Sequence, residues 1–297
     1  MTRALATDCV SLRFYLPPDD LRPFVTTIYL MEIGGAPGCE PVEDRLHPEW
    51  ANLRLIEDGS ISAAVGDEAL RAADRVVMTG PTSRATRFVA QPGRSWGIGL
   101  LPLGWTRLTS APASDYADRF VDALQDPAFV RLRCLDGVKE HSGEDPQRHK
   151  DRLVDALRTA LGAGHSREQD IVRLEQALVN PTIHTVAELA DRSGLSIRST
   201  ERLCRAAFGF SPQLLLRRQR FLRSLAQYML DPSLKWIDTL DSHYHDQAHF
   251  VRDFKRFMGM GPSEYARLPH PVLGAAAHAR KAVAGEAMQV LHRPPGA

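Results

Sequence analysis

The sequence has little that supports a metal-binding, disulfide-rich or membrane protein. Its four cysteines (Cys9, Cys39, Cys134, Cys204) are far apart and form no CxxC pair, which excludes zinc-finger spacing and a dense disulfide framework. We therefore expect reduced thiols. No apolar run approaches the roughly 18 residues needed to cross a bilayer. The N-terminus also lacks the apolar core of a signal peptide. The expectation is a cytoplasmic protein without a membrane partner.

Motifs of catalysis and metal binding are missing as well. The chain has no nucleophile elbow, P-loop or GxGxxG pattern. Only His47 precedes residue 140, so a histidine-ligated metal centre is not expected there. His243, His245 and His249 lie near Tyr244, but their spacing places them on different faces of a helix. We predict no metal, no cofactor and no enzymatic activity.

The charge is distributed unevenly along the chain. The formal net charge is only +1, yet residues 181–270 hold 13 Lys/Arg against 9 Asp/Glu, whereas residues 1–180 hold 21 against 26. The 297 residues are enough for two domains, and a hydrophobic content of 43% allows a core without disulfides or metals. A basic C-terminal unit behind an acidic N-terminal one indicates that only the former meets a polyanion.

The predicted organisation is α+β, with a β-rich barrel or cupin-like N-terminal domain and an all-α C-terminal domain. Short apolar runs between Gly and Pro turns predict strands at Val25–Ile33, Asn52–Ile56 and Arg75–Met78. Amphipathic helices are predicted at Asp115–Leu124, Arg148–Leu161 and Asp170–Val179. The expected domains are 1–105 (β-rich), 106–180 (its helical extension), 181–268 (two helix-turn-helix units joined by a long helix) and 269–297 (a disordered tail).

An internal repeat carries most of the functional information. The segment Phe208–Pro212 recurs fifty residues later as Met258–Pro262, and each copy ends a helix at Gly before a Pro. Three further pairs share the offset: Ser196 with Asp246, Arg202 with Arg252, and Arg205 with Lys255. Because Ser and Asp are good N-cap residues, each copy predicts a helix that begins at this first pair.

Each predicted helix has one apolar face and one polar face. The apolar stripes are Thr200, Leu203, Cys204, Ala207 and Phe208 in the first helix, and Phe250, Phe254 and Phe257 in the second. The polar rows are Arg198, Arg202 and Arg205 in the first, and Ala248, Arg252 and Lys255 beside Gln247 and Val251 in the second. A shorter helical stretch precedes each, with a turn at Gly194 in the first copy. This pattern is typical of helix-turn-helix units.

A long helix, Pro212–Leu230, is predicted to join the two copies and to end at Asp231-Pro232. A rigid helix of this kind fixes the spacing of the two recognition helices. Two recognition helices roughly 34 Å apart enter successive major grooves on one face of a duplex.

The segments Thr185–Pro212 and His245–Tyr265 resemble the AraC/XylS family, whose DNA-binding domain has two helix-turn-helix units joined by a central helix. The resemblance covers roughly 90 of the 297 residues. It departs from the family at His243-Tyr244, where Gly normally precedes an aromatic residue. We therefore expect a distorted first helix in the second unit.

The resemblance implies a role for individual side chains. Base or phosphate contacts are expected from Arg198, Glu201, Arg202 and Arg205 in the first unit and from Gln247, Ala248, Val251, Arg252 and Lys255 in the second. Arg can bind guanine and Gln can bind adenine with two hydrogen bonds. Arg217 and Arg218 are expected to contact phosphates, which set register without reading sequence. The alternative interpretation is that these residues form solvated helix faces.

The family also implies partners: double-stranded DNA, RNA polymerase, an unknown small-molecule effector and a second copy in a homodimer. His47, Trp50, Arg84 and Trp96 are candidates for an N-terminal pocket, but nothing in the sequence fixes their positions and core or surface roles are favoured. The predicted function is regulation of transcription by sequence-specific DNA binding. The alternative is a DNA-repair-like enzyme fused to a helix-turn-helix module, which would need a reactive cysteine near the N-terminus.

Overall fold

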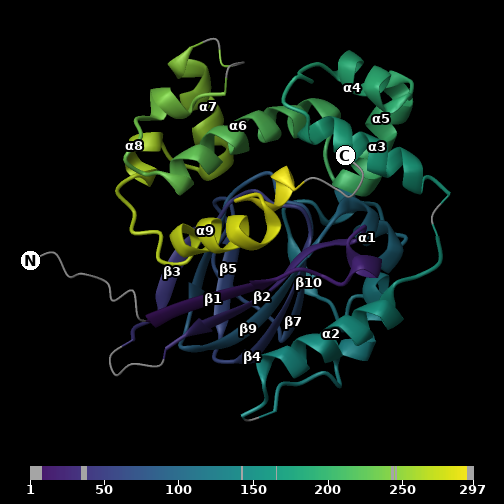
Figure 1. The fold of residues 1–297 in the computed structure, drawn as a ribbon, viewed down its shortest axis with the longest axis vertical. Helices are drawn as coiled ribbons and strands as arrows, with labels where there is room; N and C mark the ends of the chain where they lie inside the picture. Colours follow the sequence, from purple (N-terminus) through teal and green to yellow (C-terminus); the bar gives the residue numbers. More distant parts are fainter. Residues whose placement is uncertain are drawn as a thin grey trace, which may run out of the picture.

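The computed structural model describes residues 9–34, 39–141, 143–164, 166–241, 244 and 246–292. Two antiparallel sheets form its N-terminal part, and the C-terminal helices lie above them in Figure 1. The expected α+β class, with a β-rich N-terminal and a helical C-terminal part, is confirmed.

The strands form two sheets. The first sheet has the order β1 (Val10–Tyr15), β2 (Val25–Ile33), β9 (Gly93–Leu100), β4 (Asn52–Asp58), β7 (Val76–Thr79) and β10 (Phe120–Asp122). The second has the order β3 (Val42–Leu46), β8 (Thr86–Ala90), β5 (Ile61–Val65) and β6 (Arg71–Ala72). In the first sheet Ile28 of β2 lies opposite Ile98 of β9, and both are fully buried.

The helices follow, and most lie late in the chain. They are α1 (Pro102–Leu108), α2 (Pro146–Ala160), α3 (Glu168–Val179), α4 (Val186–Ser193), α5 (Ile197–Leu203), α6 (Pro212–Leu230), α7 (Gln247–Met258), α8 (Pro262–Tyr265) and α9 (Leu273–Ala284). Short 3-10 turns occur at Asp19–Leu21, Ala113–Tyr116, Pro127–Leu135, Trp236–Thr239 and Gln289–Leu291. A π turn at Cys204–Phe208 continues α5.

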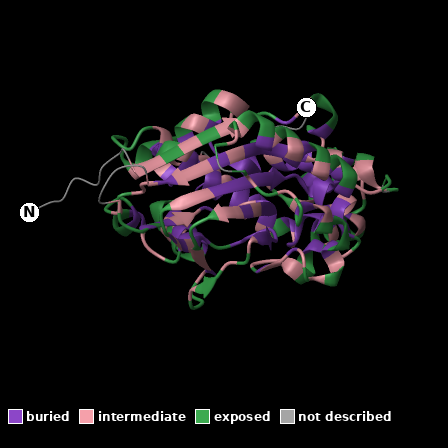
Figure 2. Ribbon diagram, turned by 90° about the horizontal axis from the view of Figure 1, so that it is seen from below, coloured by how far each residue is buried: buried purple, intermediate pink, exposed green. Residues whose placement is uncertain are grey.

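Hydrophobic cores lie on the two faces of the first sheet. Leu153 and Leu157 of α2 pack with Trp96 and Ile98 in one core. The other core is shared between the second sheet and the C-terminal helices, and Trp50 meets Phe208 there at 5.5 Å between ring centroids. Buried residues accordingly concentrate in the strands (Figure 2). The C-terminal helices are thus packed onto the β-rich part.

The helix predicted at Asp115–Leu124 is wrong. A short turn, Ala113–Tyr116, leads instead into β10, which pairs with β7. Asp118 has a φ of 57°, which an α-helix does not allow. Its carboxylate accepts hydrogen bonds from the backbone N–H and the hydroxyl of Ser83, at 2.5 and 2.7 Å. A partner distant in sequence therefore overrides the helical pattern.

The prediction of a disordered tail after residue 269 is also wrong for the described part. Helix α9 packs against β1, β3 and α6. Asp44 of β3 accepts hydrogen bonds from the backbone N–H groups of Val272 and Leu273, at 2.9 and 2.8 Å. These N–H groups belong to the unpaired first turn of α9, so Asp44 caps the helix from another part of the fold.

Two of the four cysteines are paired, which corrects the expectation of reduced thiols. Cys9 and Cys39 form a disulfide, whereas Cys134 and Cys204 are free. This bond ties the start of β1 to the segment that enters β3. Among the described residues, no helix is both long and apolar enough to cross a membrane.

Candidate nucleic-acid interface and interior cavity

The first helix-turn-helix unit follows its local sequence signals closely. Helix α4 begins with a capping box, in which Thr185 and Glu188 each bind the other's backbone N–H. It ends at Gly194, whose φ of 68° permits the sharp turn that glycine adopts without strain. Ser196 then caps α5 by accepting from the N–H of Ser199 at 3.2 Å. The predicted turn at Gly194 and the predicted N-cap at Ser196 are confirmed.

The recognition helix of this unit, α5 with its π turn, buries the predicted stripe. Thr200, Cys204 and Phe208 are fully buried, and the turn ends at Gly209 with a φ of 85°. The opposite face of this helix is exposed to solvent. Its polar side chains are exposed and make no hydrogen bond or ion pair with any residue in the described ranges: Arg198, Glu201, Arg202 and Arg205.

The second unit has a well-formed recognition helix and a reduced first helix. Asp246 caps α7 by accepting from the N–H of His249 at 2.6 Å, and α7 ends at Gly259 with a φ of 73°. Its phenylalanines pack around Phe221 of α6, as in the T-shaped contact of Phe254 at 5.3 Å. In place of a first helix, the described residues between α6 and α7 form only the 3-10 turn Trp236–Thr239. The expected distortion is therefore present, while His243 and His245 lie outside the described residues.

The polar face of α7 is exposed along most of its length. Gln247, Ala248, Arg252 and Lys255 are exposed, and Val251 is half-buried. Lys255 also lines a polar pocket between α7 and the β-rich part, opposite Arg84. The matched pair Arg202 and Arg252 thus projects from equivalent positions of two helices.

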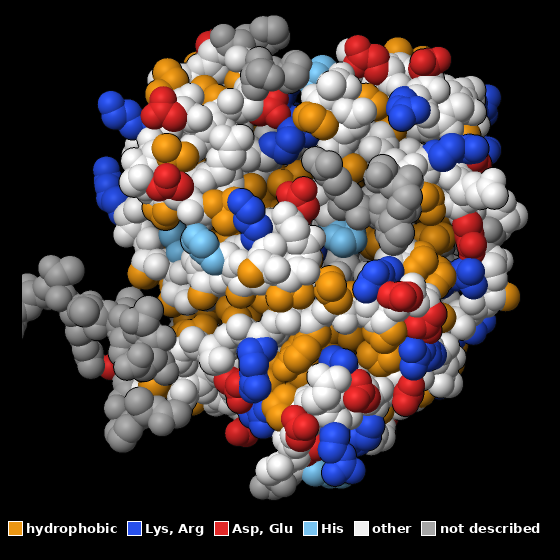
Figure 3. All heavy atoms as spheres, in the orientation of Figure 1, with side chains coloured by type: hydrophobic (Ala, Val, Ile, Leu, Met, Phe, Trp, Pro, Cys, Tyr) orange, Lys and Arg blue, Asp and Glu red, His pale blue; other side chains and the backbone are white. Residues whose placement is uncertain are grey.

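Helix α6 joins the units, with α4 and α5 near one end and α7 near the other (Figure 1). In this view, Lys and Arg side chains lie along the upper left and upper right edges of the molecule (Figure 3). They are mixed with acidic side chains. A band of hydrophobic side chains crosses the middle of the same face, at the level where α9 lies over the strands (Figure 3).

The two arginines of α6 predicted to contact phosphates have other partners. Arg217 is half-exposed, and its Nε pairs with the fully buried carboxylate of Asp253 in α7. Arg220 reaches the same carboxylate at 3.3 Å. Tyr244 donates its hydroxyl to it at 3.0 Å. The ion pairs of Asp253 therefore connect α6 to the second recognition helix, α7.

The prediction for Arg218 is wrong, because its side chain is fully buried against the β-rich part. Its guanidinium lies 4.1 Å from the ring centre of Trp50 and donates to the carbonyl oxygen of Thr82 at 2.8 Å. A helix turns about 100° per residue, so neighbouring arginines at 217 and 218 face different sides. Burial lowers the pKa of Arg218 to about 9, which leaves it protonated at neutral pH. Arg218 therefore connects α6 to the β-rich part of the protein.

Comparison with known families identifies this region. Residues 189–268 match the family model of a helix-turn-helix domain. This segment is an AraC-type DNA-binding domain. The chain that carries it is a DNA-binding transcription regulator. No curated protein matches the chain.

Several solved structures show a distant likeness to this chain. ToxT from Vibrio cholerae aligns with 9% identity over 87% of this chain and 98% of its own, with a TM-score of 0.44. Unsaturated fatty acid-bound ToxT aligns with 12% identity over 90% and 97%, with a TM-score of 0.41. The AraC-like activator CuxR aligns with 13% identity over 76% and 90%, with a TM-score of 0.27. These scores are low, and no functional argument rests on them.

The β-rich part of this regulator encloses a cavity of about 170 Å³. Its walls come from both sheets, and α9 with the segment around Gln289 forms a further wall. Most of the lining is apolar, for example Phe14, Met31 and Phe88. Of the predicted pocket residues, His47 lines this cavity and Arg84 lines the polar pocket, whereas Trp50 and Trp96 are core residues.

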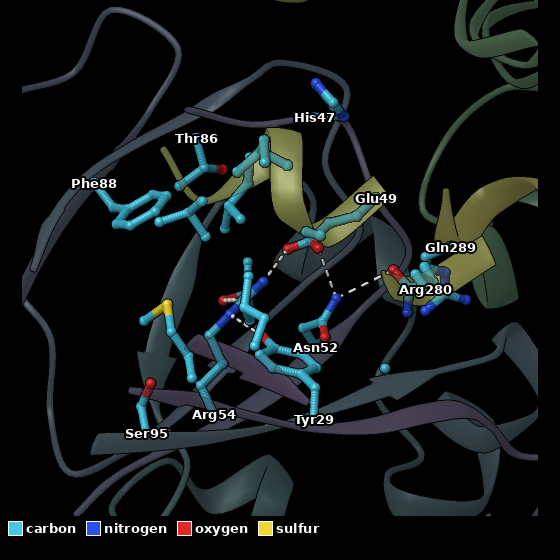
Figure 4. Close-up of a pocket in the computed structure, with 18 of the residues that line it drawn as sticks. Tyr29, His47, Glu49, Asn52, Arg54, Thr86, Phe88, Ser95, Arg280 and Gln289 are labelled. Atoms are coloured by element: carbon cyan, nitrogen blue, oxygen red, sulfur yellow. Dashed lines mark hydrogen bonds and ion pairs between the residues drawn. The ribbon is translucent and has the colours of Figure 1, made fainter. Parts of the chain in front are cut away.

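A hydrogen-bonded network occupies one side of the cavity (Figure 4). Arg54 donates to the carboxylate of Glu49 at 2.5 Å, to the hydroxyl of Tyr29 at 3.1 Å and to that of Thr79 at 3.0 Å. Asn52 donates to Glu49 at 2.8 Å and to Gln289 at 3.1 Å. Burial raises the pKa of Glu49, and the neighbouring Arg54 opposes this rise. Sequence reasoning missed this network because its members come from four separate segments.

His47 lies at another edge of the cavity and contacts the helical part. Its Nε2 is 2.7 Å from the hydroxyl oxygen of Tyr265 in α8. Burial lowers the pKa of His47 to about 4, so the imidazole is neutral at pH 7. The cavity is therefore bounded at both His47 and α9 by contacts with C-terminal segments.

Proposed function

We propose that the protein regulates transcription by reading a specific DNA sequence with both recognition helices, under the control of a small molecule bound in the cavity. The main support is the repeated row of exposed side chains on α5 and α7. Arg202 and Arg252 occupy matched positions and have no partner among the described residues, so both are available to base edges or phosphates.

Individual roles follow from position and exposure. We assign base contacts to Arg202 and Arg252, with Gln247 beside the latter. Contacts with phosphates or neighbouring bases are assigned to Arg198, Arg205 and Lys255. Among the remaining predicted residues, Ala248 and Val251 contribute apolar contacts in the groove, and the exposed carboxylate of Glu201 can accept a hydrogen bond from cytosine. Arg218 has no part in this interface in the present conformation, because its guanidinium is buried.

The assignment is tested by selecting the preferred DNA site from a genomic library and then measuring affinities. Arg202→Ala and Arg252→Ala should each weaken binding to that site by about 10- to 100-fold, from the roughly 1–3 kcal/mol of one two-pronged base contact. Binding to random DNA should change much less. Arg148→Ala, at an exposed arginine of α2, is the matched control. Equal losses on both DNAs would make the arginines phosphate contacts and refute base reading.

Salt dependence gives an independent test of the DNA interface. With about five phosphate contacts per subunit, a fourfold increase in salt should weaken binding several-hundred-fold. A flat response would contradict the proposal whatever the sequence preference.

Control by a small molecule is supported by the contacts around Glu49. Its carboxylate binds Arg54 and Asn52 at the cavity, while its carbonyl oxygen accepts from Arg218 of α6 at 3.3 Å. The backbone N–H of Ala85 in the β-rich part also donates to the carbonyl oxygen of Phe257 in α7, at 2.7 Å. A molecule that rearranges the cavity therefore acts on residues in direct contact with the DNA-binding domain.

The remaining partners stay part of the proposal. The AraC-type domain favours contact with RNA polymerase and action as a homodimer, and a cytoplasmic location follows from the need to reach DNA. The enzymatic alternative would need a reactive cysteine near the N-terminus. Cys9 and Cys39 form a disulfide, burial raises the pKa of Cys204 to about 12, and burial also raises that of Cys134. No cysteine is therefore a thiolate at neutral pH.

A further inference from the structure

Arg280 of α9 is the one arginine of the cavity wall, within the described residues, that has no carboxylate partner. Its side chain is 6% exposed. Nη1 donates to the hydroxyl of Thr27 at 2.5 Å, whereas Nε and Nη2 are buried without any hydrogen bond. In Figure 4, Arg280 lies beside Gln289, which accepts a hydrogen bond from Asn52 of the network around Glu49. A buried cation with two open donors thus borders an apolar space.

Arg54, which lines the same cavity, differs from Arg280 because each of its side-chain nitrogens donates a hydrogen bond. Its three nitrogens donate to Glu49, Tyr29 and Thr79. Glu49 is hydrogen-bonded to Arg54 and Asn52, so its charge acts on Arg280 only at longer range. The charge of Glu286 also favours the charged form of Arg280, but neither Nε nor Nη2 of Arg280 donates a hydrogen bond to it. Burial lowers the pKa of Arg280 to about 10, so the guanidinium remains charged at neutral pH. The ligand-free protein therefore carries a buried charge that has no hydrogen-bonded anion, which is an unfavourable arrangement.

The two open donors suggest which chemical group would compensate this charge. Nε and Nη2 lie along one edge of the guanidinium, and that edge matches the two oxygens of a carboxylate. The cavity of about 170 Å³ is similar in size to cavities of about 150 Å³ that admit a benzene ring. Apolar side chains such as Phe14, Met31 and Phe88 supply the remaining walls.

We propose, building on the small-molecule control described above, that the effector is a small monocarboxylate with an apolar body and that Arg280 binds its carboxylate. The apolar body fills the space between the sheets. The guanidinium turns its Nε and Nη2 edge toward the ligand and keeps or exchanges its bond to Thr27. Because Arg280 belongs to α9, which packs on α6, the binding residue is carried by a segment directly connected to the DNA-binding domain.

The test compares carboxylates with their primary amides, which have nearly the same shape and no charge. Hexanoate, octanoate and benzoate, each with its amide, are titrated into the full-length protein by calorimetry. We expect at least one carboxylate to bind at least about ten-fold more tightly than its amide, as a hydrogen-bonded charge pair provides. In Arg280→Met this preference should disappear. Lys281→Met, at an exposed cation of the same helix, is the matched control and should retain it.

Three outcomes would overturn the proposal: equal binding of acids and amides, a preference that survives in Arg280→Met, or no binding of any probe. A second measurement separates a ligand-binding role from a structural one. Without ligand, Arg280→Met should have a Tm equal to or above that of the wild type, since the substitution removes a buried charge that has no hydrogen-bonded anion. A lower Tm would assign Arg280 to structure. DNA binding of the same samples tests the regulator function separately, because loss of effector binding leaves the recognition helices unchanged.

Discussion

The buried carboxyl of Glu175 in α3 predicts how the stability of the protein depends on pH. Its side chain is 1% exposed, and Oε1 has no hydrogen-bond partner. Burial raises the pKa of this carboxyl to about 8. In the unfolded chain a glutamate titrates near pH 4.3. The folded protein therefore holds a proton at Glu175 over a range in which the unfolded chain has released it, and stability falls as the pH rises through this range.

Glu175→Gln replaces the carboxyl by a neutral group of the same shape. At pH 7 the shift corresponds to about 3 kcal/mol, since each pKa unit is worth about 1.4 kcal/mol. We expect the variant to be more stable than the wild type at pH 7, with a Tm higher by roughly 6–12 °C. At pH 5 the difference should be below about 1 kcal/mol, because this pH lies less than one unit above the pKa of the unfolded chain and releasing that proton then favours unfolding only slightly.

The assay is thermal unfolding of both proteins at pH 5, 6, 7 and 8. Glu264→Gln, at an exposed carboxyl of α8, serves as the control and should show no such trend. A Tm difference that is independent of pH, or a variant that is less stable at pH 7, would refute the reasoning. Either result would mean that Glu175 is ionised and paired in the folded protein.

Three further predictions concern caps, ion pairs and pH. Ser196→Ala and Asp246→Ala should each lower the free energy of unfolding in urea by about 1 kcal/mol, and unchanged values would mean that the caps are dispensable. Asp253→Asn should cost about 3 kcal/mol in the same assay because Arg217 loses its carboxylate, and a neutral effect would show that solvent replaces the pair. Wild-type stability should decline from pH 6.5 to about 4 as the unfolded chain protonates His47. His47→Gln should reduce that decline by up to about 3 kcal/mol, and an unaltered pH profile would exclude His47 as its source.

The helix-turn-helix units could be predicted residue by residue because their signals are local. The N-caps Ser196 and Asp246, the turn at Gly194 and the ends at Gly209 and Gly259 each depend on neighbours within a few positions. Helical periodicity then assigned the buried stripe and the exposed row. A local signal of another kind, an apolar run between turn residues, predicted β2 at Val25–Ile33, which the structure reproduces.

Interactions between distant segments escaped prediction. Helix α9 is capped by Asp44, and the segment of Asp118 is held by Ser83, so neither structure has a local signal. The disulfide between Cys9 and Cys39 depends in the same way on how β1 and β3 are placed.

What the sequence by itself determined is therefore the DNA-binding domain and its outward-facing arginines. Helical caps and periodicity are properties of a few consecutive residues. Only the tertiary structure decided that Arg218 points into the β-rich part while Arg217 stays at the surface, and that Arg280 borders a cavity. Two arginines have the same local chemistry whether they meet water, an aromatic ring or an apolar space. Which of these surrounds each one is decided by chain segments far away in the sequence.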